Sequence, residues 1–379
     1  MKILYFTTSA RSIHDWRFLT KMVESGYEVL AVYISAKGGK YLVQGTKILD
    51  LGCDEYLETE KLSIKFLALI KKRAYFKLRH AIKEFHPDVL HAGWVSSCGF
   101  LAALSGFHPL LLMPWGSDIL IGPRKNLFYR KIVQFTIKRA DMITCDAETV
   151  KKEIIQLADY PQEKIVVFPW GIDLSLFKPD ISLRVNLRKR LGIEGKKVII
   201  MNRSFKTLYG IEYFLKALPK VRLKVPNVHV LLIGSGPLET ELRKLVEELK
   251  IESVVKFMGG VNNEEMPSYL NASDLYVSSS LSDGTSLSLL EAMACALPVV
   301  VTDVPAILEW VENGVNGLVV PRRSIDELAE AIIYLLQRED VRKEMGEKNI
   351  AIAKERADWD KNFKKLEDIY KTLVYGGTK

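Results

Sequence analysis

Short runs of apolar residues, many of them β-branched, recur along the chain and are separated by longer segments with helical periodicity. Near-continuous apolar strands that alternate with helices are typical of parallel sheets covered by helices on both faces. The pattern therefore predicts an α/β protein. The predicted strands of the first half are residues 2–6, 27–34, 53–57, 88–92, 109–114, 142–146 and 164–169, and those of the second half are 197–202, 228–233, 254–258, 275–279, 298–302 and 317–320.

So many strands exceed what one open sheet usually holds, and a chain of 379 residues suits two domains. The segment 169–179 (PWGIDLSLFKP) carries two prolines and a glycine directly after the last strand of the first half. We therefore predict a doubly wound, Rossmann-like domain over 1–178, a second over 179–357, and an amphipathic terminal helix within 358–379 that packs back on the first domain. Ligands of such sheets bind beyond the carboxyl ends of the strands, so the chemistry is expected in a cleft between the two facing domains.

Positive charge is distributed unevenly along the chain. The net charge is +8; residues 1–178 hold 25 Lys and Arg against 18 Asp and Glu, whereas residues 179–379 hold 29 against 28. The excess lies in two segments, 61–83 and 124–140, in which basic and apolar residues alternate at helical spacing without any acid. Such helices suit an anionic membrane surface, but packed helices whose Lys and Arg face water have the same pattern. No nucleic-acid-binding module is recognisable, so nucleic acid is not an expected partner.

The remaining composition argues against several other classes. No apolar run reaches the ~18–20 residues that span a bilayer, and the start MKILYFTTSA is interpreted as a first strand rather than an export signal. The four cysteines form no C-x-x-C pair, which favours a reducing compartment. We expect a cytoplasmic protein, with a peripheral position on the inner face of the membrane as the alternative. We expect neither a metal nor a tightly bound cofactor, and Asp358-Trp359-Asp360 is interpreted as a helix start.

The segment 275–304 (LYVSSSLSDGTSLSLLEAMACALPVVVTDV) contains the strongest candidate chemistry. It predicts a strand, a loop of small residues and a helix capped by Thr285 or Ser286. The free N–H groups and the dipole at such a helix start suit a phosphate. Asp283 lies before the helix and Glu291 about two turns later, so two carboxylates could hold hydroxyl groups of one ligand. A solvated loop acid and a helix-surface Glu are the alternative.

Cations follow another predicted strand. Arg203 and Lys206 come after residues 197–202, and cations at a strand end suit a diphosphate. Exposed loop cations without a ligand are again the alternative.

The stretch around Asp283 and Glu291 resembles the donor-site signature of glycosyltransferase family 4, whose members have the two-domain GT-B fold. That signature is an acid, seven residues, a Glu, then Ala-Met-Ala and Pro-Val-Val; here it is Asp283, GTSLSLL, Glu291 and AMACALPVV. The first acid is usually Glu and here is Asp. Residues 228–249, 254–280 and 312–321 are similar to further parts of the family pattern. The resemblance implies a retaining hexosyltransferase that is independent of metal and uses a UDP- or GDP-linked sugar.

The resemblance also implies roles for residues on the donor side. Glu291 would hold the nucleotide ribose, while Asp283 and the backbone of 284–287 would hold the sugar and its diphosphate. Arg203 matches an Arg that stabilises the leaving diphosphate; Leu208 occupies the position of the family's Lys, and Lys206 is the expected substitute. The candidate catalytic residues here are Arg203, Lys206 and Asp283, and the donor-binding candidates are Gly236, Gly284, Thr285, Ser286, Leu287 and Glu291.

The first domain is expected to bind the acceptor, and there the chain departs from the family. His91 matches the first of two family histidines and is a further catalytic candidate, but Gly93 occupies the position of the second. Trp115-Gly116-Ser117-Asp118 resembles a His-Gly-Ser-Asp segment without its histidine. The acceptor-side candidates are Ser9, Arg11 and Asp118, and a hydrogen-bonded interior histidine is the alternative for His91.

The sequence therefore predicts transfer of a sugar to a hydroxyl acceptor, which we expect to be a lipid-linked saccharide or a cell-surface glycan. A sugar-nucleotide epimerase or hydrolase of the same fold is one alternative. A non-enzymatic two-domain binding protein is the other.

Overall fold

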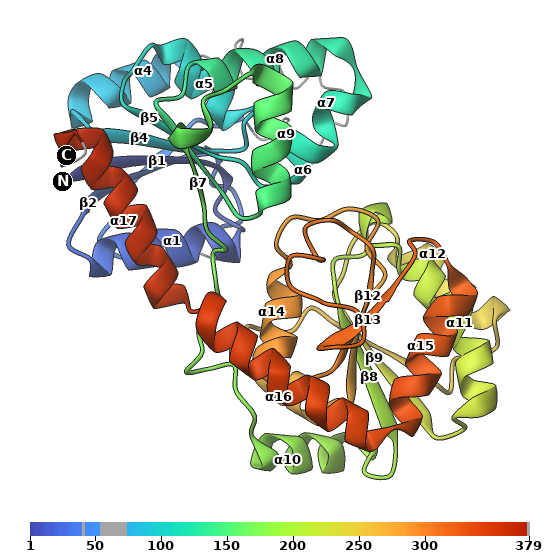
Figure 1. Cartoon of the computed structure of the whole chain (residues 1–379). Coiled ribbons are helices and arrows are strands. Elements are labelled where there is room, and N and C mark those ends of the chain that lie inside the picture. The colour runs from blue at the N-terminus through green and yellow to red at the C-terminus, as the bar shows by residue number, and fades with distance from the viewer. Residues whose placement is uncertain (40–41, 54–73, 377–379) are drawn as a thin grey trace. The chain divides into compact units, whose positions relative to one another are not determined.

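The computed structural model describes residues 1–39, 42–53 and 74–376, which form two compact units (Figure 1). Unit 1 comprises Met1–Phe168 and Phe363–Lys379, and unit 2 comprises Pro169–Asn362. Within the described residues, one sheet has seven strands and the other has six, and every pair of neighbouring strands is parallel. The predicted α/β class with two doubly wound sheets is thereby confirmed.

The sheet of unit 1 has the strand order β3-β2-β1-β4-β5-β6-β7. The direction of winding therefore reverses between β1 and β4, which lie side by side. The strands are β1 (Lys2–Ser9), β2 (Glu28–Ser35), β3 (Lys47–Asp50), β4 (Val89–Gly93), β5 (Leu110–Met113), β6 (Met142–Cys145) and β7 (Ile165–Val167).

One described strand of unit 1 was not predicted from the sequence. The structure has β3 at Lys47–Asp50, whereas the predicted strand at 53–57 lies, apart from Cys53, outside the described residues. β3 is a short edge strand with no fully buried residue, and it pairs only with β2 among the described strands. An edge strand that buries so little has little apolar pattern to reveal it.

Helices cover both faces of this sheet. α4, α5 and α8 follow one another on one face, because α5 contacts both of the others, while α1 and α17 lie on the opposite face (Figure 1). Tyr370 of α17 packs against Tyr27 and approaches the Met22 sulfur of α1. The helices are α1 (Ile13–Glu24), α4 (Ala74–Phe85), α5 (Cys98–Ser105), α6 (Ser117–Leu120), α7 (Gly122–Lys125), α8 (Leu127–Lys138), α9 (Glu148–Ala158) and α17 (Trp359–Tyr375), with a 3₁₀ turn η1 (Gln162–Lys164).

The division between the units falls at 168/169, whereas the sequence pattern placed it at 178/179. The intervening segment belongs to unit 2 because Ile172 and Phe177 are buried in its core. The Ile172 N–H also donates to the carbonyl oxygen of Ala357 at 2.8 Å. The terminal segment rejoins unit 1 from Phe363 onward.

The sheet of unit 2 has the order β10-β9-β8-β11-β12-β13, so its winding reverses between β8 and β11. Alternate strand residues enter two apolar cores, because successive side chains point to opposite faces. Ile200 and Tyr276 face α13 and α14, while Ile199 and Val277 face α11, α12 and α15. The strands are β8 (Lys197–Asn202), β9 (Val228–Ile233), β10 (Val255–Gly259), β11 (Leu275–Ser278), β12 (Val299–Thr302) and β13 (Gly317–Val320).

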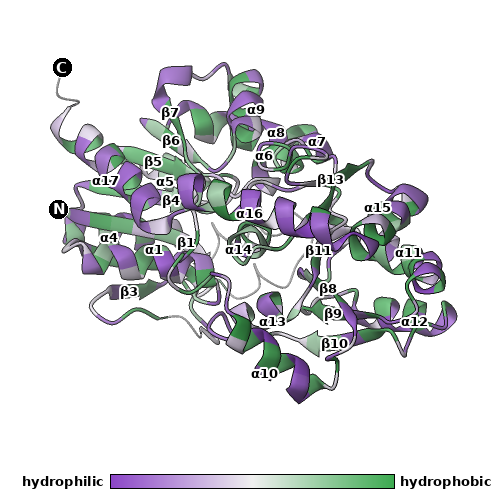
Figure 2. Cartoon of the chain, turned by 60° about the horizontal axis from the view of Figure 1, so that its bottom comes forward, coloured by the Kyte–Doolittle hydropathy of each residue, from purple (hydrophilic) through white to green (hydrophobic). Residues whose placement is uncertain are grey.

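The helices α11 (Ile211–Lys224) and α15 (Ile325–Gln337) of unit 2 carry an apolar stripe that packs in the core and a polar stripe away from it, and both show mixed colours in Figure 2. The other helices of unit 2 are α10 (Ile181–Leu191), α12 (Glu239–Glu248), α13 (Met266–Ala272), α14 (Leu287–Ala294) and α16 (Glu339–Arg356), with a 3₁₀ turn η2 (Thr207–Tyr209).

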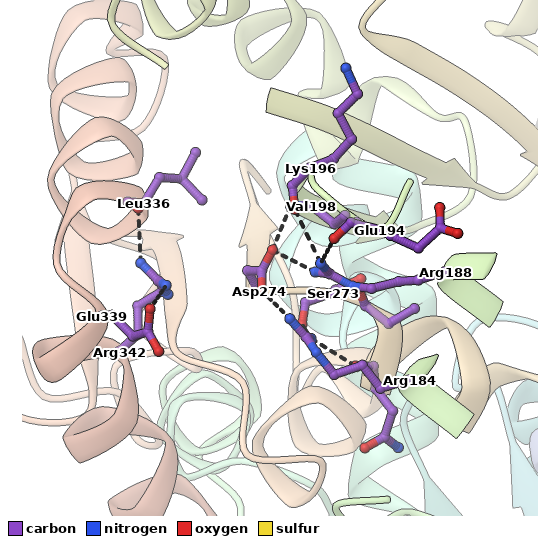
Figure 3. A network of polar contacts seen from close by, with 12 residues as sticks. Arg184, Arg188, Glu194, Lys196, Val198, Ser273, Asp274, Leu336, Glu339 and Arg342 are labelled. Atoms are coloured by element: carbon purple, nitrogen blue, oxygen red, sulfur yellow. Dashed lines mark hydrogen bonds and ion pairs between the residues drawn. The ribbon is translucent and has the colours of Figure 1, made fainter. Parts of the chain in front are cut away.

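A network of arginines joins α10 to the amino ends of β8 and β11 (Figure 3). Arg184 and Arg188 bind the two carboxylate oxygens of Asp274, and the Val198 N–H donates to the same carboxylate at 2.7 Å. Burial acts to raise the pKa of Asp274, but the Val198 N–H and the two guanidinium groups outweigh it and hold that pKa below its ordinary value. The Nη1 of Arg184 and the Nε and Nη1 of Arg188 donate to backbone carbonyl oxygens. The network therefore serves to fix α10 on its own unit.

The two basic segments are only partly described. Residues 61–73 lie outside the described residues, while the rest of the first segment forms most of α4. The second segment is broken at Asn126, which caps α8 by accepting the N–H of Tyr129 at 2.7 Å. In the described part of the chain, no helix has both the length and the apolar character to cross a membrane.

Candidate functional site

The loops that follow β8 and β11 meet at the carboxyl edge of the unit 2 sheet. These two strands are neighbours at the point where the winding reverses, so the connections that follow them leave toward opposite faces. Such a divergence opens a crevice at the strand ends and is the usual ligand position in doubly wound sheets. Arg203 follows β8 directly, and residues 279–286 lead from β11 to α14.

Arg203 joins the two loops. Its Nη2 forms an ion pair with the carboxylate of Asp283, and its Nη1 donates to the hydroxyl oxygens of Ser286 at 2.8 Å and Ser288 at 3.0 Å. The ring of Tyr209 lies beneath the guanidinium, with 3.9 Å between the Arg203 Cζ and the ring centroid. Two residues that the sequence predicted for one site, Arg203 and Asp283, are thus in direct contact.

The electrostatics of this pair keep a cation at the site. Burial disfavours the charged guanidinium, but Asp283 and the neighbouring tyrosines raise the pKa of Arg203 above its ordinary value. Burial also raises the pKa of the Asp283 carboxyl, and Arg203 offsets only part of that rise. The Arg203 Nε is buried and has no hydrogen-bond partner among the described residues. A buried guanidinium donor without an acceptor favours an anionic ligand at this position.

The helix α14 contributes its amino end to the same place. Ser286 caps it, and its hydroxyl oxygen accepts the N–H of Leu289 at 3.4 Å, as the sequence predicted for Thr285 or Ser286. Gly284 and Thr285 lie in the loop immediately before the cap, and Leu287 is the first helical residue. Glu291 lies one turn into the helix and is partly exposed.

The loop that carries Arg203 is held from two sides. A Cβ atom at Gly234 would lie 2.1 Å from the carbonyl oxygen of Arg203, and one at Gly236 would lie 2.6 Å from that of Phe205. The glycine turn after β9 therefore allows two backbones to approach each other. On the other side, the hydroxyl of Ser279 donates to the carbonyl oxygen of Gly210 at 2.8 Å. The structure thus gives Gly236 a role in supporting the Arg203 loop.

The other cation of this loop is placed differently. Lys206 is exposed, three residues after the partly buried Arg203. Nothing in the structure ties its side chain to Asp283 or to α14.

Sequence reasoning missed three residues around Arg203, namely Ser288, Tyr209 and Tyr276. The hydroxyl of Tyr276 is 2.9 Å from that of Ser288, which is 3.1 Å from that of Ser286, so a chain of hydroxyl groups backs the guanidinium. The run Ser286-x-Ser288 at a helix start was the available signal for the two serines. Nothing in the sequence marked Tyr209, because its approach to Arg203 depends on the turn η2.

In unit 1, His91 lies in the interior instead of at a ligand-accessible edge. It is fully buried in β4, and its Nδ1 forms a hydrogen bond of 2.6 Å with the hydroxyl of Tyr370. Burial lowers the pKa of His91 to about 3, so the imidazole is neutral. This environment favours the hydrogen-bonded interior histidine over the catalytic role that the sequence suggested.

The acceptor-side candidates fall into two groups. Asp118 is buried, and its carboxylate oxygens accept the N–H groups of Val95 and Trp115, each at 2.9 Å. It therefore joins the loops that follow β4 and β5. Ser9 ends β1 and Arg11 is exposed beyond it, where its Nε donates to the carbonyl oxygen of Lys37 at 3.2 Å.

A hollow of unit 2 lies at the opposite edge of the sheet, beside the Arg184–Asp274 network. It has a volume of about 380 Å³ and is lined by residues that include Arg184, Asn271, Glu339 and Arg342. The Arg342 Nη1 donates to the carbonyl oxygens of Leu335 and Leu336 at 2.6 and 2.9 Å, which ends α15 (Figure 3). Among the described residues, no cluster of His, Cys, Asp and Glu could hold a metal ion.

Comparison with known proteins gives matches to both units. The family described as "Glycosyl transferases group 1" matches residues 184–352, and "Glycosyl transferase 4-like" matches residues 2–147. The N-acetyl-α-D-glucosaminyl L-malate synthase of Bacillus anthracis is 27% identical over 306 residues, which cover 79% of this chain and 77% of that protein.

A GDP-mannose-dependent α-(1-6)-phosphatidylinositol monomannoside mannosyltransferase of Mycobacterium tuberculosis is 28% identical over 215 residues, 55% of this chain and 56% of the relative. The chain thus matches less than two thirds of that relative's length. Among solved structures, HepE of Anabaena in complex with UDP superposes with a TM-score of 0.82 at 22% identity, covering 98% of this chain and 100% of that chain.

Proposed function

The chain belongs to the family 4 type of glycosyltransferases with the GT-B fold, and on that premise we propose that it transfers a sugar from a nucleoside diphosphate sugar to a hydroxyl acceptor. The observation that carries the proposal is the Arg203 guanidinium at the amino end of α14, whose buried Nε has no acceptor among the residues that the structure describes. A guanidinium, a helix start and capping hydroxyl groups together provide the donors that a diphosphate needs.

The donor binds at the carboxyl edge of unit 2 in this proposal. Arg203 and the first N–H groups of α14 offset the negative charge that develops on the diphosphate as it leaves the sugar. Glu291 holds the ribose hydroxyl groups, and Asp283 holds hydroxyl groups of the sugar. Gly236 acts by keeping the Arg203 loop in position, and Lys206 supplies additional charge from the exposed part of that loop.

We extend the proposal to a reaction that retains the anomeric configuration without a metal ion. Arg203 supplies the charge stabilisation that a divalent cation provides in other phosphoryl sites. UDP and GDP both suit the anion site, since its donors contact the diphosphate. Support for each comes from relatives: HepE was solved with UDP and with UDP-glucose, and the mycobacterial relative is GDP-mannose-dependent.

We propose a membrane-associated saccharide as the acceptor. The named substrate of the mycobacterial relative is a phosphatidylinositol monomannoside, and a solved neighbour, WaaG, is involved in lipopolysaccharide biosynthesis.

The surface of unit 1 carries large apolar side chains next to basic residues. Phe76 on α4 is 66% exposed, and Leu127 on α8 is 77% exposed. Arg79 and Lys83 accompany Phe76 along α4. Such a surface suits anionic lipid at the inner face of a membrane.

The test of donor use is release of labelled nucleotide from UDP- and GDP-sugars. We expect release with one of the two series, and a loss of at least about 100-fold in Arg203→Ala, as is typical for a lost transition-state donor. Lys220→Ala, on the exposed face of α11, is the matched control. Full activity of an Arg203→Ala/Glu291→Ala double variant would exclude the assigned site.

Two further measurements separate the parts of the proposal. Donor turnover that needs no acceptor would favour an epimerase or hydrolase. Co-sedimentation with anionic but not neutral vesicles would support the membrane surface, whereas equal failure with both would remove it. A Phe76→Ser/Leu127→Ser variant is expected to weaken the sedimentation.

A further inference from the structure

Three aromatic rings gather where the winding of the unit 1 sheet reverses. Trp94 follows β4 directly, Trp115 comes two residues after β5, and His14 lies in the first turn of α1, which follows β1. Their backbones therefore belong to the connections that leave the carboxyl ends of β1, β4 and β5. That edge of a doubly wound sheet is the general position for a ligand.

The two indole rings are nearly parallel. Their planes differ by 14° and their centroids are 6.3 Å apart, while the His14 ring centroid is 5.9 Å from that of Trp115. All three residues are partly exposed, although the Trp115 Nε1 and the His14 Nδ1 are buried, so part of this aromatic cluster reaches solvent. We name Trp94, Trp115 and His14 the aromatic platform.

Gly93 makes room for this platform. A Cβ atom at position 93 would lie 2.7 Å from the Trp115 Nε1, and further ring atoms follow at 3.5 and 3.7 Å. The indole of Trp115 therefore lies directly against the Gly93 backbone. Any side chain at position 93 would displace it.

Hydrogen bonds to the backbone fix the loops that carry Trp94 and Trp115. Asp118 accepts the N–H of Trp115 and that of Val95, so one buried carboxylate fixes the loops that carry both tryptophans. Trp94 has φ 54°, a left-handed conformation that is rare for a bulky residue. Its carbonyl oxygen accepts the N–H groups of Ser97 and Gly99 at 3.0 and 3.1 Å, which locks that conformation. Backbone strain that the surroundings enforce is characteristic of ligand sites.

We propose that the aromatic platform stacks against a pyranose ring of the acceptor, so that the acceptor class is a cyclic saccharide instead of an acyclic alcohol or a bare lipid headgroup. The inference rests on the proposed function and specifies its acceptor. Aromatic faces carry partial negative charge and attract the weakly positive C–H groups on the apolar face of a pyranose.

Binding can be measured without catalysis by tryptophan fluorescence. The probes are methyl glycosides of common hexopyranoses, with glycerol and sorbitol as acyclic polyols that carry hydroxyl groups but no pyranose ring. We expect saturable quenching by at least one glycoside and none by the polyols. The signal should disappear in Trp94→Phe/Trp115→Phe and persist in Trp170→Phe, whose tryptophan is buried in unit 2.

Kinetics give a second readout. Gly93→Ala leaves both indoles in the chain but forces Trp115 from its position, and we expect its KM for a glycoside acceptor to rise at least tenfold with a smaller change in kcat. Trp94→Ala should behave similarly, and Trp94→Phe should recover part of the loss. Hydrogen-exchange protection of β1 and β4 shows that unit 1 of each variant is folded, and a nucleotide-induced thermal shift shows that its donor site is intact.

Two results would overturn the inference while leaving the proposed function standing. One is equal use of acyclic and cyclic acceptors by an enzyme that releases nucleotide. The other is an unchanged acceptor KM in both Gly93→Ala and Trp94→Ala. Failure of the proposed function itself would appear separately, as the absence of nucleotide release from any donor.

Discussion

The guanidinium of Arg203 has two possible anionic partners, because it is paired with Asp283 in the ligand-free chain and faces a diphosphate in the proposed complex. Asp283→Asn removes the competing charge at nearly constant volume. We expect UDP or GDP to bind about tenfold more tightly, which corresponds to about 1.4 kcal/mol. Sugar transfer should become slower, since the amide is a weaker acceptor for the sugar hydroxyl groups. Isothermal titration and initial rates measure the two effects.

Ser282→Ala, in the same loop, is the control for that substitution and should bind nucleotide as the unaltered chain does. Weaker nucleotide binding in Asp283→Asn would contradict the idea that the diphosphate replaces Asp283 as the partner of Arg203. It would mean that the carboxylate supports the anion site by orienting Arg203.

His91 links stability to pH. Its pKa is lowered to about 3 by burial, whereas an unfolded histidine titrates near 6.5. Below about pH 6.5 the unfolded chain binds a proton that the folded chain excludes, so the stability contribution is complete above that pH and is lost as the pH falls toward 3. We expect a loss of about 1.4 kcal/mol per pH unit within that window. Denaturant unfolding of unit 1 from pH 7 to pH 4 measures it.

His91→Gln is the comparison, because its amide can still form a hydrogen bond with the Tyr370 hydroxyl but does not titrate. The difference in unfolding free energy between the two proteins should shrink as the pH falls. A difference that is constant from pH 7 to pH 4 would show that the burial of His91 is not coupled to its protonation.

Among single residues, the sequence predicted the two members of the ion pair but not the surroundings of His91. Arg203 and Asp283 were both predicted as site residues from strand ends and signature spacing. The interior placement of His91 was weighed only as an alternative, because its partner Tyr370 is 279 positions away along the chain. Contacts of that separation depend on the tertiary fold and leave no local pattern.

At the scale of elements, the turn after β9 supports the Arg203 loop by close backbone approach. Gly234→Ala would place a methyl group 2.1 Å from the Arg203 carbonyl oxygen, and Gly234 has φ 139°. We expect unit 2 to lose about 2–4 kcal/mol of stability, which is large for one substitution, together with most of its nucleotide affinity. Denaturant unfolding and nucleotide titration check the two parts.

Gly195→Ala is the matched control in the same unit, since a Cβ atom there meets no atom within 4 Å. It should change neither the stability of unit 2 nor its affinity for nucleotide appreciably. Equal behaviour of the two variants would show that the turn can move away from the Arg203 loop without consequence.

Strands were largely predictable because buried parallel strands are short, apolar and β-branched throughout. β8 and β9 begin and end at the predicted residues, Lys197–Asn202 and Val228–Ile233. β3 was not predictable, since an edge strand with exposed residues lacks that pattern. The meeting of the loops after β8 and β11 was expected from the family resemblance, because the local sequence pattern does not give the strand order.

At the scale of the whole molecule, unit 1 is made from both ends of the chain. Phe363, Leu366 and Tyr370 of α17 are almost completely buried there, although the preceding residues belong to unit 2. The composition of 358–379 predicted an amphipathic helix, and its apolar face has its neighbours in α1 and β4. Unit 2, in contrast, is a continuous segment with two apolar cores of its own.

A chain that ends at residue 362 should therefore lose stability in unit 1 alone. Fully burying a large apolar side chain is worth about 1.5–3 kcal/mol, so removing those of α17 costs several kcal/mol as an upper estimate. Hydrogen exchange should show faster exchange in β1 and β4, unchanged protection in β8 and β11, and a preserved thermal shift with nucleotide. A chain that ends at Gly376 is the control and should exchange as the full chain does. Loss of protection in β8 together with β1 would contradict the independence of the two cores, because it would show that α17 stabilises both units as one cooperative structure.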